Sequence, residues 1–209
     1  MTDDARFWDK TARRYAAGAI SDLPGYERTF DRTRALLAGA GEVLEIGGGT
    51  GTTALRLAPG VGRLISTDVS GGMIAIGREK AAEQGCGNVE VVQAPAAAPH
   101  GGDAAYHAVL AFNLLHLLSD LPAVLALVRR MLRPGGLFIS KTPCLSEMNP
   151  LIRLAVPVAR LLGKAPHVAF FTGAGLEADM AQAGFSIVER ARHGSGRKDP
   201  RIFLVARPV

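Results

Sequence analysis

The chain has 209 residues, of which 48% are hydrophobic and 21% are charged, and its formal net charge is +5. This balance predicts one globular domain, residues 1–209, and excludes a disordered chain or a pure repeat array. The opening MTDDARFWDK has no basic run followed by an apolar run, and no later stretch offers eighteen uncharged apolar residues. We therefore expect a cytoplasmic protein without a spanning helix.

Two helices are predicted before the first strand. Residues from about Thr2 to Ala38 have helical spacing, which SDLPGY interrupts at Pro24 and Gly25. We expect residues 1–40 to form a helical cover over the rest of the domain.

Seven short apolar or β-branched runs follow, and most are separated by stretches that favour helices. They are GEVLEI, GRLISTD, NVEVVQ, HAVLAFN, GLFISKT, FSIVERA and RIFLVARP. Five alternations of strand and helix predict a parallel sheet. Because the last two runs are joined by HGSGRKDP, which suits a hairpin, the final strand should be antiparallel. The sequence predicts an α/β fold, a doubly wound, Rossmann-like, mixed seven-stranded sheet.

The first run leads into a glycine-rich turn, VLEIGGGTG, from Val43 to Gly51. A tight turn between a buried strand and a helix needs positive φ or close backbone approach, which glycine allows at least cost. Such a loop also leaves room for a nucleoside-bearing ligand near the helix N-terminus. A purely steric reason for the glycines stays open at this point.

Two carboxylates accompany this loop. Asp68 ends the second run, about twenty residues later, where a carboxylate accepts hydrogen bonds from ribose hydroxyls. This arrangement fits a nicotinamide cofactor as well. Glu45 lies inside the first strand, where a dehydrogenase would have an apolar residue and where burial of a lone carboxylate is costly. An acidic group there suits a ligand with a cationic amino-acid head.

These residues resemble those of the class I S-adenosylmethionine-dependent methyltransferases, in particular the small-molecule branch around the ubiquinone-biosynthesis type. VLEIGGGTG is similar to the first motif of the family, STDVSGGMI to the second, HAVLAFNLLHLL to the fourth and LRPGGLFIS to the turn before the fifth strand. TGAGLEADMAQAGFSIVE resembles the late segment in which a helix precedes the sixth strand. The resemblance covers nearly the whole chain and implies S-adenosylmethionine as cofactor.

The resemblance also implies roles for individual residues. Glycines of the loop would line the methionine portion, Glu45 would support its ammonium group and Asp68 would hold the ribose. The remaining cofactor contacts implied by the family are Tyr15, Gly47, Gly49, Gly51, Val69, Met73, Ala94, Pro95 and Asn113. Asn113 has an equally good interpretation as a turn residue at the end of the fourth strand.

The chain departs from the family at two positions. The third motif of the family commonly carries an acidic residue, but this chain has VVQAPAAAP, so only backbone and apolar walls at Ala94 and Pro95 are offered. The fourth strand begins with Tyr106 and His107 where relatives often have Asp after an aromatic residue. Because neither change affects Glu45 or Asp68, we expect cofactor binding to persist with lower affinity.

Methyl transfer from a sulfonium needs positioning and exclusion of water more than a nucleophilic protein residue. A hydroxyl acceptor would benefit from a general base, for which His116, Glu147 and His167 are the candidates. His116, set among leucines, also fits a packing role. No pattern of metal ligands is visible.

The segment 143–172 is predicted to be a helical substrate lid. Its apolar residues exceed what one buried helix face needs, and those expected to form the lid are Met148, Leu151, Leu154, Val158, Leu161, Phe170 and Phe171. An apolar lid predicts a small, hydrophobic or amphiphilic acceptor. Plain core packing, peripheral membrane contact and a dimer interface are the alternatives, and a monomer or a homodimer is expected.

Two classes of function follow. The first is methyl transfer to a small molecule, with the acceptor atom (O, N, S or C) open. The second is a non-catalytic protein of the same fold. A substrate of RNA or anionic lipid is a lesser alternative, because the basic segment RARHGSGRKDPR lacks the interleaved aromatic residues that stack bases.

Overall fold

The computed structural model describes residues 3–98, 100–148, 150–161, 165–196 and 199–209. The strands are β1 (Glu42–Ile46), β2 (Arg63–Asp68), β3 (Val89–Gln93), β4 (Tyr106–Phe112), β5 (Leu132–Pro143), β6 (Phe185–Ala191) and β7 (Arg201–Pro208). The α-helices are α1 (Asp3–Ala17), α2 (Leu23–Leu36), α3 (Thr52–Leu57), α4 (Gly71–Glu83), α5 (Leu121–Met131), α6 (Ile152–Leu161) and α7 (Gly173–Gln182). Short 3-10 turns are η1 (Ala58–Gly60), η2 (Leu115–Leu117) and η3 (Leu145–Glu147).

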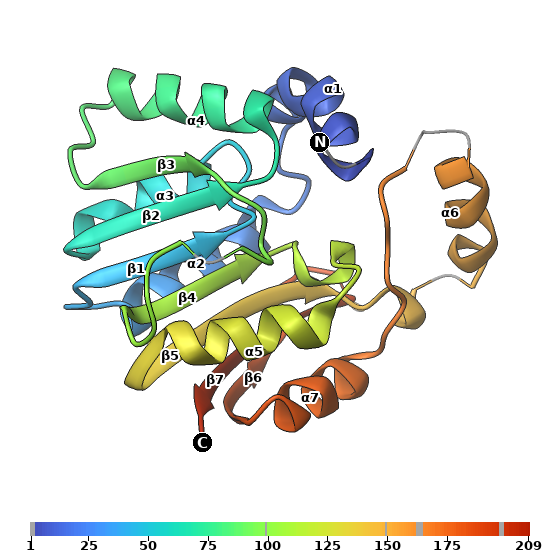
Figure 1. Cartoon of the computed structure of the whole chain (residues 1–209). Helices are drawn as coiled ribbons and strands as arrows, with labels where there is room; N and C mark the ends of the chain where they lie inside the picture. Colours follow the sequence, from blue (N-terminus) through green and yellow to red (C-terminus); the bar gives the residue numbers. More distant parts are fainter. Residues whose placement is uncertain (1–2, 99, 149, 162–164, 197–198) are drawn as a thin grey trace.

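The strands form one mixed sheet in the order β3-β2-β1-β4-β5-β7-β6 (Figure 1). Neighbours from β3 to β5 run parallel, whereas β7 is antiparallel to both β5 and β6. The predicted doubly wound, seven-stranded sheet with an antiparallel last strand is therefore confirmed. The order reverses between β1 and β4, and ligands of open α/β sheets bind at the carboxyl ends of strands beside such a reversal.

Helices cover both faces of the sheet, as the parallel strands require (Figure 1). On one face, α5 and α7 pack against the larger hydrophobic cluster, to which they contribute Leu125 and Leu176. On the other face, Phe30 of α2 and Leu57 of α3 pack against Val43, with Leu110 and Ile139 in the same cluster. The central strands β1, β4 and β5 are hydrophobic on both sides because both sides are buried, whereas the edge strands β3 and β6 have exposed residues.

The N-terminal segment forms two helices as predicted, but the interruption lies earlier than Pro24. Asp22 caps α2, because its side chain accepts a hydrogen bond from the Gly25 amide at 3.0 Å, and Pro24 occupies the first turn of the helix. Proline is tolerated there because its missing N–H has no partner within the helix. The connection therefore lies between the end of α1 and Asp22, and Pro24 lies in the first turn of the second helix.

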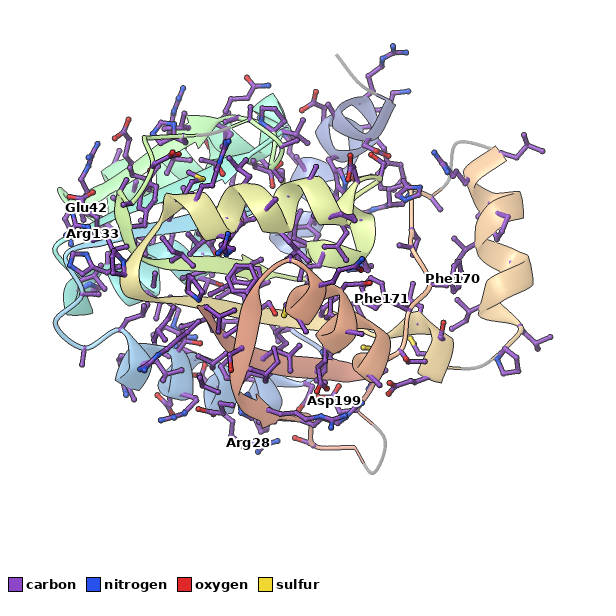
Figure 2. The ribbon with its side chains drawn as sticks, turned by 60° about the horizontal axis from the view of Figure 1, so that its bottom comes forward. Arg28, Glu42, Arg133, Phe170, Phe171 and Asp199 are labelled. Carbon is purple, nitrogen blue, oxygen red and sulfur yellow. The ribbon has the colours of Figure 1, made fainter. Side chains whose placement is uncertain are left out.

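The segment predicted to be a lid contains η3 and α6, followed by an extended stretch that returns to α7. In Figure 1, α6 lies to the side of the sheet, away from its strands. The extended stretch is fixed by the Ala169 amide, which donates to the His116 carbonyl at 2.7 Å. Figure 2 shows Phe170 near α6 and Phe171 toward the body of the protein, where Phe171 packs against the larger cluster. The side chains of Leu154 and Val158 lie outside the described residues.

Candidate active site

A cavity of about 660 Å³ lies at the carboxyl ends of β1, β4 and β5. Its walls come from the end of α1 and the connection to α2, the first turns of α2, the glycine loop after β1, and the ends of β4, β5 and the start of β7. It lies beside the reversal in strand order, where a ligand is expected. Of the residues predicted to bind a cofactor, Tyr15, Glu45, Gly47, Gly49 and Asn113 line it.

The glycines of the loop meet different steric needs. Gly47, Gly49 and Gly51 have φ of +67°, +58° and +69°, a region that costs other L-residues strain. A Cβ on Gly47 would also lie 2.6 Å from Leu114 Cδ1. A Cβ on Gly49 would meet only the Tyr15 ring, at 3.9 Å, so this glycine keeps the cavity open. Gly51 does not line the cavity and instead begins α3.

Glu45 is 2% exposed and lines the cavity from β1. The Ser66 hydroxyl donates to Glu45 Oε2 at 2.9 Å. Burial raises the pKa of the Glu45 carboxyl to about 7, and the negative charge of Asp68 acts in the same direction, whereas the Ser66 bond opposes it. The adjacent Gly48 has to be glycine, because a Cβ there would lie 2.0 Å from Ser66 Oγ and 2.6 Å from Glu45 Oε2. A buried acid with its carboxylate at a cavity wall is suited to a cationic ligand.

Asp68 connects the loop to the next strand and lies outside the cavity lining. Its Oδ2 accepts from the Gly49 amide at 3.0 Å, and its Oδ1 accepts from the Ser70 amide at 2.9 Å. Burial raises the pKa of Asp68, although both amide bonds oppose this. This carboxylate therefore positions the glycine loop, and each oxygen retains a lone pair for a further donor.

The other residues expected to contact adenine also lie outside the cavity lining. Met73 is 2% exposed in the first turn of α4, so its side chain contributes to the core. Val69 is half-buried, Pro95 is exposed, and the Ala94 amide donates to the Asp68 carbonyl at 3.0 Å. The structure brings these residues together beside the ends of β2 and β3, next to the cavity.

The end of α1 covers the glycine loop. The Tyr15 ring stands edge-on to Trp8, with ring centroids 6.1 Å apart. Partial burial raises the pKa of the Tyr15 hydroxyl, and the charges of Asp68 and Glu45 add to the effect. The helix is anchored by Asp9, whose Oδ1 accepts from Ser70 Oγ at 2.6 Å and from a backbone amide of α4 at 2.9 Å.

The three candidate general bases do not line the cavity. Glu147 accepts from the Gly173 amide at 2.6 Å and pairs with Arg192 at 2.7 Å, and these bonds lower its pKa. His167 is joined through Nδ1 to Arg160 at 3.1 Å. Burial lowers the pKa of His116 to about 4, and its Nδ1 has no hydrogen-bond partner within the described part of the chain. The side chains of Glu147 and His167 thus make structural contacts around α6 and α7.

Several polar residues of the cavity wall were not predicted. Lys141 at the end of β5, Arg201 at the start of β7 and Asp22 before α2 all line it, as does Lys80 of α4. Lys141 follows GLFIS at the carboxyl end of a parallel strand, the same signal that singled out Asn113 at the end of β4. The two are joined, since the Asn113 amide donates to the Lys141 carbonyl at 2.8 Å.

Comparison with known proteins agrees with this geometry. Residues 43–136 match a family model described as a methyltransferase domain. The matched residues include the glycine loop, Glu45 and Asp68. This part of the chain is thus similar to methyltransferase domains.

Curated relatives match a little under half of the chain. A ubiquinone/menaquinone biosynthesis C-methyltransferase UbiE of Marinomonas sp. is 40% identical over 99 residues, which are 45% of this chain and 39% of that protein. UbiE of Francisella tularensis subsp. novicida is 35% identical over 98 residues, with the same coverage of 45% and 39%. The chain thus spans about two fifths of the length of these relatives.

Solved structures share the fold of the chain at lower identity. An S-adenosylmethionine-dependent methyltransferase of Mesorhizobium loti superposes with a TM-score of 0.71 at 16% identity, covering 85% of this chain and 96% of that one. The [4+2]-cyclase SpnF superposes with a TM-score of 0.70 at 20% identity, covering 88% and 81%. These two proteins are named for different reactions, so function has to be argued from the site. Within the described residues, no helix has the length and apolar character to cross a membrane.

Proposed function

We propose that the chain binds S-adenosylmethionine and transfers its methyl group to a small-molecule acceptor. The observation that carries this proposal is the buried Glu45 carboxylate at the wall of a cavity beside the glycine loop. A buried acid that served only the fold would be replaced by an apolar residue at no loss, because an ionised carboxylate is costly to bury. A ligand with an ammonium group accounts for it.

The residues around the loop fit the amino-acid head of this cofactor. Glu45 would accept hydrogen bonds from the ammonium group, and Lys80 lies on the other side of the loop, where it would face the carboxylate. Its Nζ donates to the hydroxyls of Thr50 and Thr52 at 3.1 and 3.0 Å, and no carboxylate lies within 4.0 Å of it among the described residues. The open position beside Gly49 would let the ligand lie against bare backbone.

Asp68 would hold the ribose hydroxyls, and Val69, Ala94 and Pro95 would border the adenine. The family resemblance and the position of Asp68 at the end of β2 support this assignment. Met73 is assigned an indirect role, because its side chain is buried behind the backbone that would meet the base.

When bound, the cofactor supplies an electrophilic methyl group on a sulfonium. The contribution of the chain is to orient the reactants and to exclude water. Tyr15, Tyr26 and Phe112 enclose the cavity from three sides, and α1 is tied down over it through Asp9. None of the three candidate bases faces the cavity, so the proposal assigns no proton transfer to them.

Within the single proposed domain, the N-terminal cover lines the cavity and the segment proposed as a lid does not. Tyr15 to Asp22 line the cavity, which supports a covering role for residues 1–40. No described residue of 143–172 lines the cavity, and Val156, Leu161 and Phe170 instead line a separate shallow groove along α6. A lid role for this segment would therefore require α6 to move.

Calorimetric titration with S-adenosylmethionine, with NAD as the control ligand, tests the proposal. We expect binding of the former alone. Glu45→Gln should weaken that binding at least tenfold. Glu42→Gln, which removes a carboxylate at the opposite end of the same strand, should leave the binding unchanged. Glu42 does not line the cavity, and Figure 2 shows it on the opposite side of the view from Phe170. Absence of binding by the unmodified protein, or equal binding by Glu45→Gln, would refute the assignment.

A further inference from the structure

Lys141 is a buried cation in the wall of the cavity. It is 7% exposed and lies at the carboxyl end of β5. The sheet register aligns Glu45 with Leu110 and Leu110 with Ile139, so Lys141 lies on the same face as Glu45, one side-chain layer nearer the carboxyl edge. Two strand spacings, ~10 Å, separate the backbones of β1 and β5. Lys141 therefore faces the cavity beyond the glycine loop.

The hydrogen bonds of Lys141 are made to neutral groups. Its Nζ donates to Thr29 Oγ1 at 2.7 Å and to the Gly25 carbonyl at 3.4 Å. No carboxylate lies within 4.0 Å of this ammonium group in the part of the chain that the structure describes. An ammonium group has three donors, so one donor remains available to a ligand.

The charges around Lys141 leave it uncompensated. Arg201, which also lines the cavity, is held by Asp199 at 2.8 Å and by Asp22 at 3.4 Å. Burial lowers the pKa of Lys141, and the charges of Arg201 and Arg28 add to this lowering. The charges of Asp199 and Asp22 oppose it. Figure 2 shows Arg28 and Asp199 on the same side of the protein. Arg201 engages both acids, and among the described residues no carboxylate lies within 4.0 Å of the Lys141 ammonium group, so Lys141 has no direct counterion in the cavity wall.

We propose that Lys141 is the acceptor-binding residue of this site and that it binds a single carboxylate of the methyl acceptor. This inference rests on the proposed function. The cofactor has its own carboxylate, which Lys80 beside the glycine loop would meet, whereas Lys141 lies two strands further along the sheet. A monoanion matches one uncompensated cation, and a dianionic phosphate would exceed it.

The residues that line this end of the cavity with Lys141 indicate what the rest of the acceptor is like. Phe30, Phe112 and Tyr26 line the same space and provide an apolar surface. A planar or aliphatic acid, with its carboxylate at Lys141 and its apolar part against these rings, would fill the space between α2 and the sheet. The acceptor is therefore an amphiphilic carboxylic acid rather than a purely hydrophobic molecule.

Benzoate and benzamide, which have nearly the same shape but differ in charge, test the proposal. Their dissociation constants are measured by NMR titration at pH 7, with the cofactor site saturated by S-adenosylhomocysteine. We expect benzoate to bind the unmodified protein at least tenfold more tightly than benzamide. Lys141→Met should abolish this preference and leave the affinity for S-adenosylhomocysteine unchanged. Lys10→Met, which removes an exposed lysine of α1, should retain the preference.

The outcomes separate this proposal from the proposed function. Equal binding of benzoate and benzamide, binding of neither, or a preference that survives Lys141→Met overturns the acceptor site. Loss of S-adenosylhomocysteine binding in Lys141→Met would also overturn it, because Lys141 would then belong to the cofactor. If the unmodified protein binds no S-adenosylhomocysteine, the proposed function fails, and the same titration without cofactor still decides whether Lys141 binds the carboxylate. Thermal unfolding checks each variant, and Lys141→Gln replaces Lys141→Met should the latter not fold.

Discussion

Glu45→Gln should stabilise the fold at alkaline pH while it abolishes tight cofactor binding. Burial raises the pKa of Glu45 from 4.5 to about 7. Because the folded-state pKa lies above the unfolded value, the native state binds the proton more tightly. The stability from this group is therefore present below pH 4.5 and is lost as the pH rises through 7. Between pH 5 and pH 8 the loss amounts to about 2 to 3 kcal/mol.

The glutamine side chain keeps an oxygen that can accept the Ser66 hydroxyl but carries no charge. The free energy of unfolding of Glu45→Gln and of the unmodified protein is measured by urea titration at pH 5 and pH 8. The difference between the two proteins should shift in favour of the variant by about 2 to 3 kcal/mol from pH 5 to pH 8. Calorimetry at pH 8 should show at least tenfold weaker binding of S-adenosylmethionine. A stability difference between the two proteins that is the same at both pH values would refute the reasoning about burial of the charge. Glu42→Gln is the matched control.

Three further substitutions test the positioning of the site. Asp68→Ala leaves the amides of Gly49 and Ser70 without acceptors, so we expect a loss of about 2 kcal/mol of stability in urea unfolding and a cofactor dissociation constant at least several-fold higher. Asp9→Ala removes the acceptor of Ser70 Oγ and should increase hydrogen exchange in α1 but not in the β-sheet. Glu147→Gln weakens the cap of α7, so the melting temperature should fall by about 2 to 4 °C with no change in the cofactor dissociation constant. Weaker cofactor binding by the last variant would return Glu147 to the candidate bases.

The sheet was predictable from the sequence because each strand is a short apolar or β-branched run that is bounded by glycine or polar residues. The position of the helix break was not, because Pro24 is compatible with a break and with a first helical turn. The hydrogen bond from the Gly25 amide to Asp22 decides where the helix begins. The pattern SDLPG contains this capping residue, but the proline in the same pattern also predicts a break.

The candidate site was predictable where one strand and its turn define it. Glu45 and the glycine loop are close in sequence, and a carboxylate in a buried strand is unusual enough to indicate a ligand. The roles of Glu147 and His167 could not be predicted, since their partners Arg192 and Asp4 lie 45 and 163 residues away along the chain. The amide of His167 donates to Asp4, which shows that the extended stretch after α6 returns to α1.

The basic segment before β7 shows why the acceptor end of the cavity was missed. As a sequence it indicates a solvated hairpin tip, because Lys and Arg at such a tip usually serve solubility. In the fold, the Ser195 amide and hydroxyl donate to Asp22 at 2.9 and 2.7 Å, and Arg28 donates to the His193 carbonyl at 2.8 Å. These bonds tie the hairpin to the start of α2 and bring Arg201 to the cavity wall, where it engages the acids that would otherwise neutralise Lys141. The positive charge that we assign to acceptor binding thus depends on contacts between segments about 170 residues apart, which periodicity and spacing along the chain do not reveal.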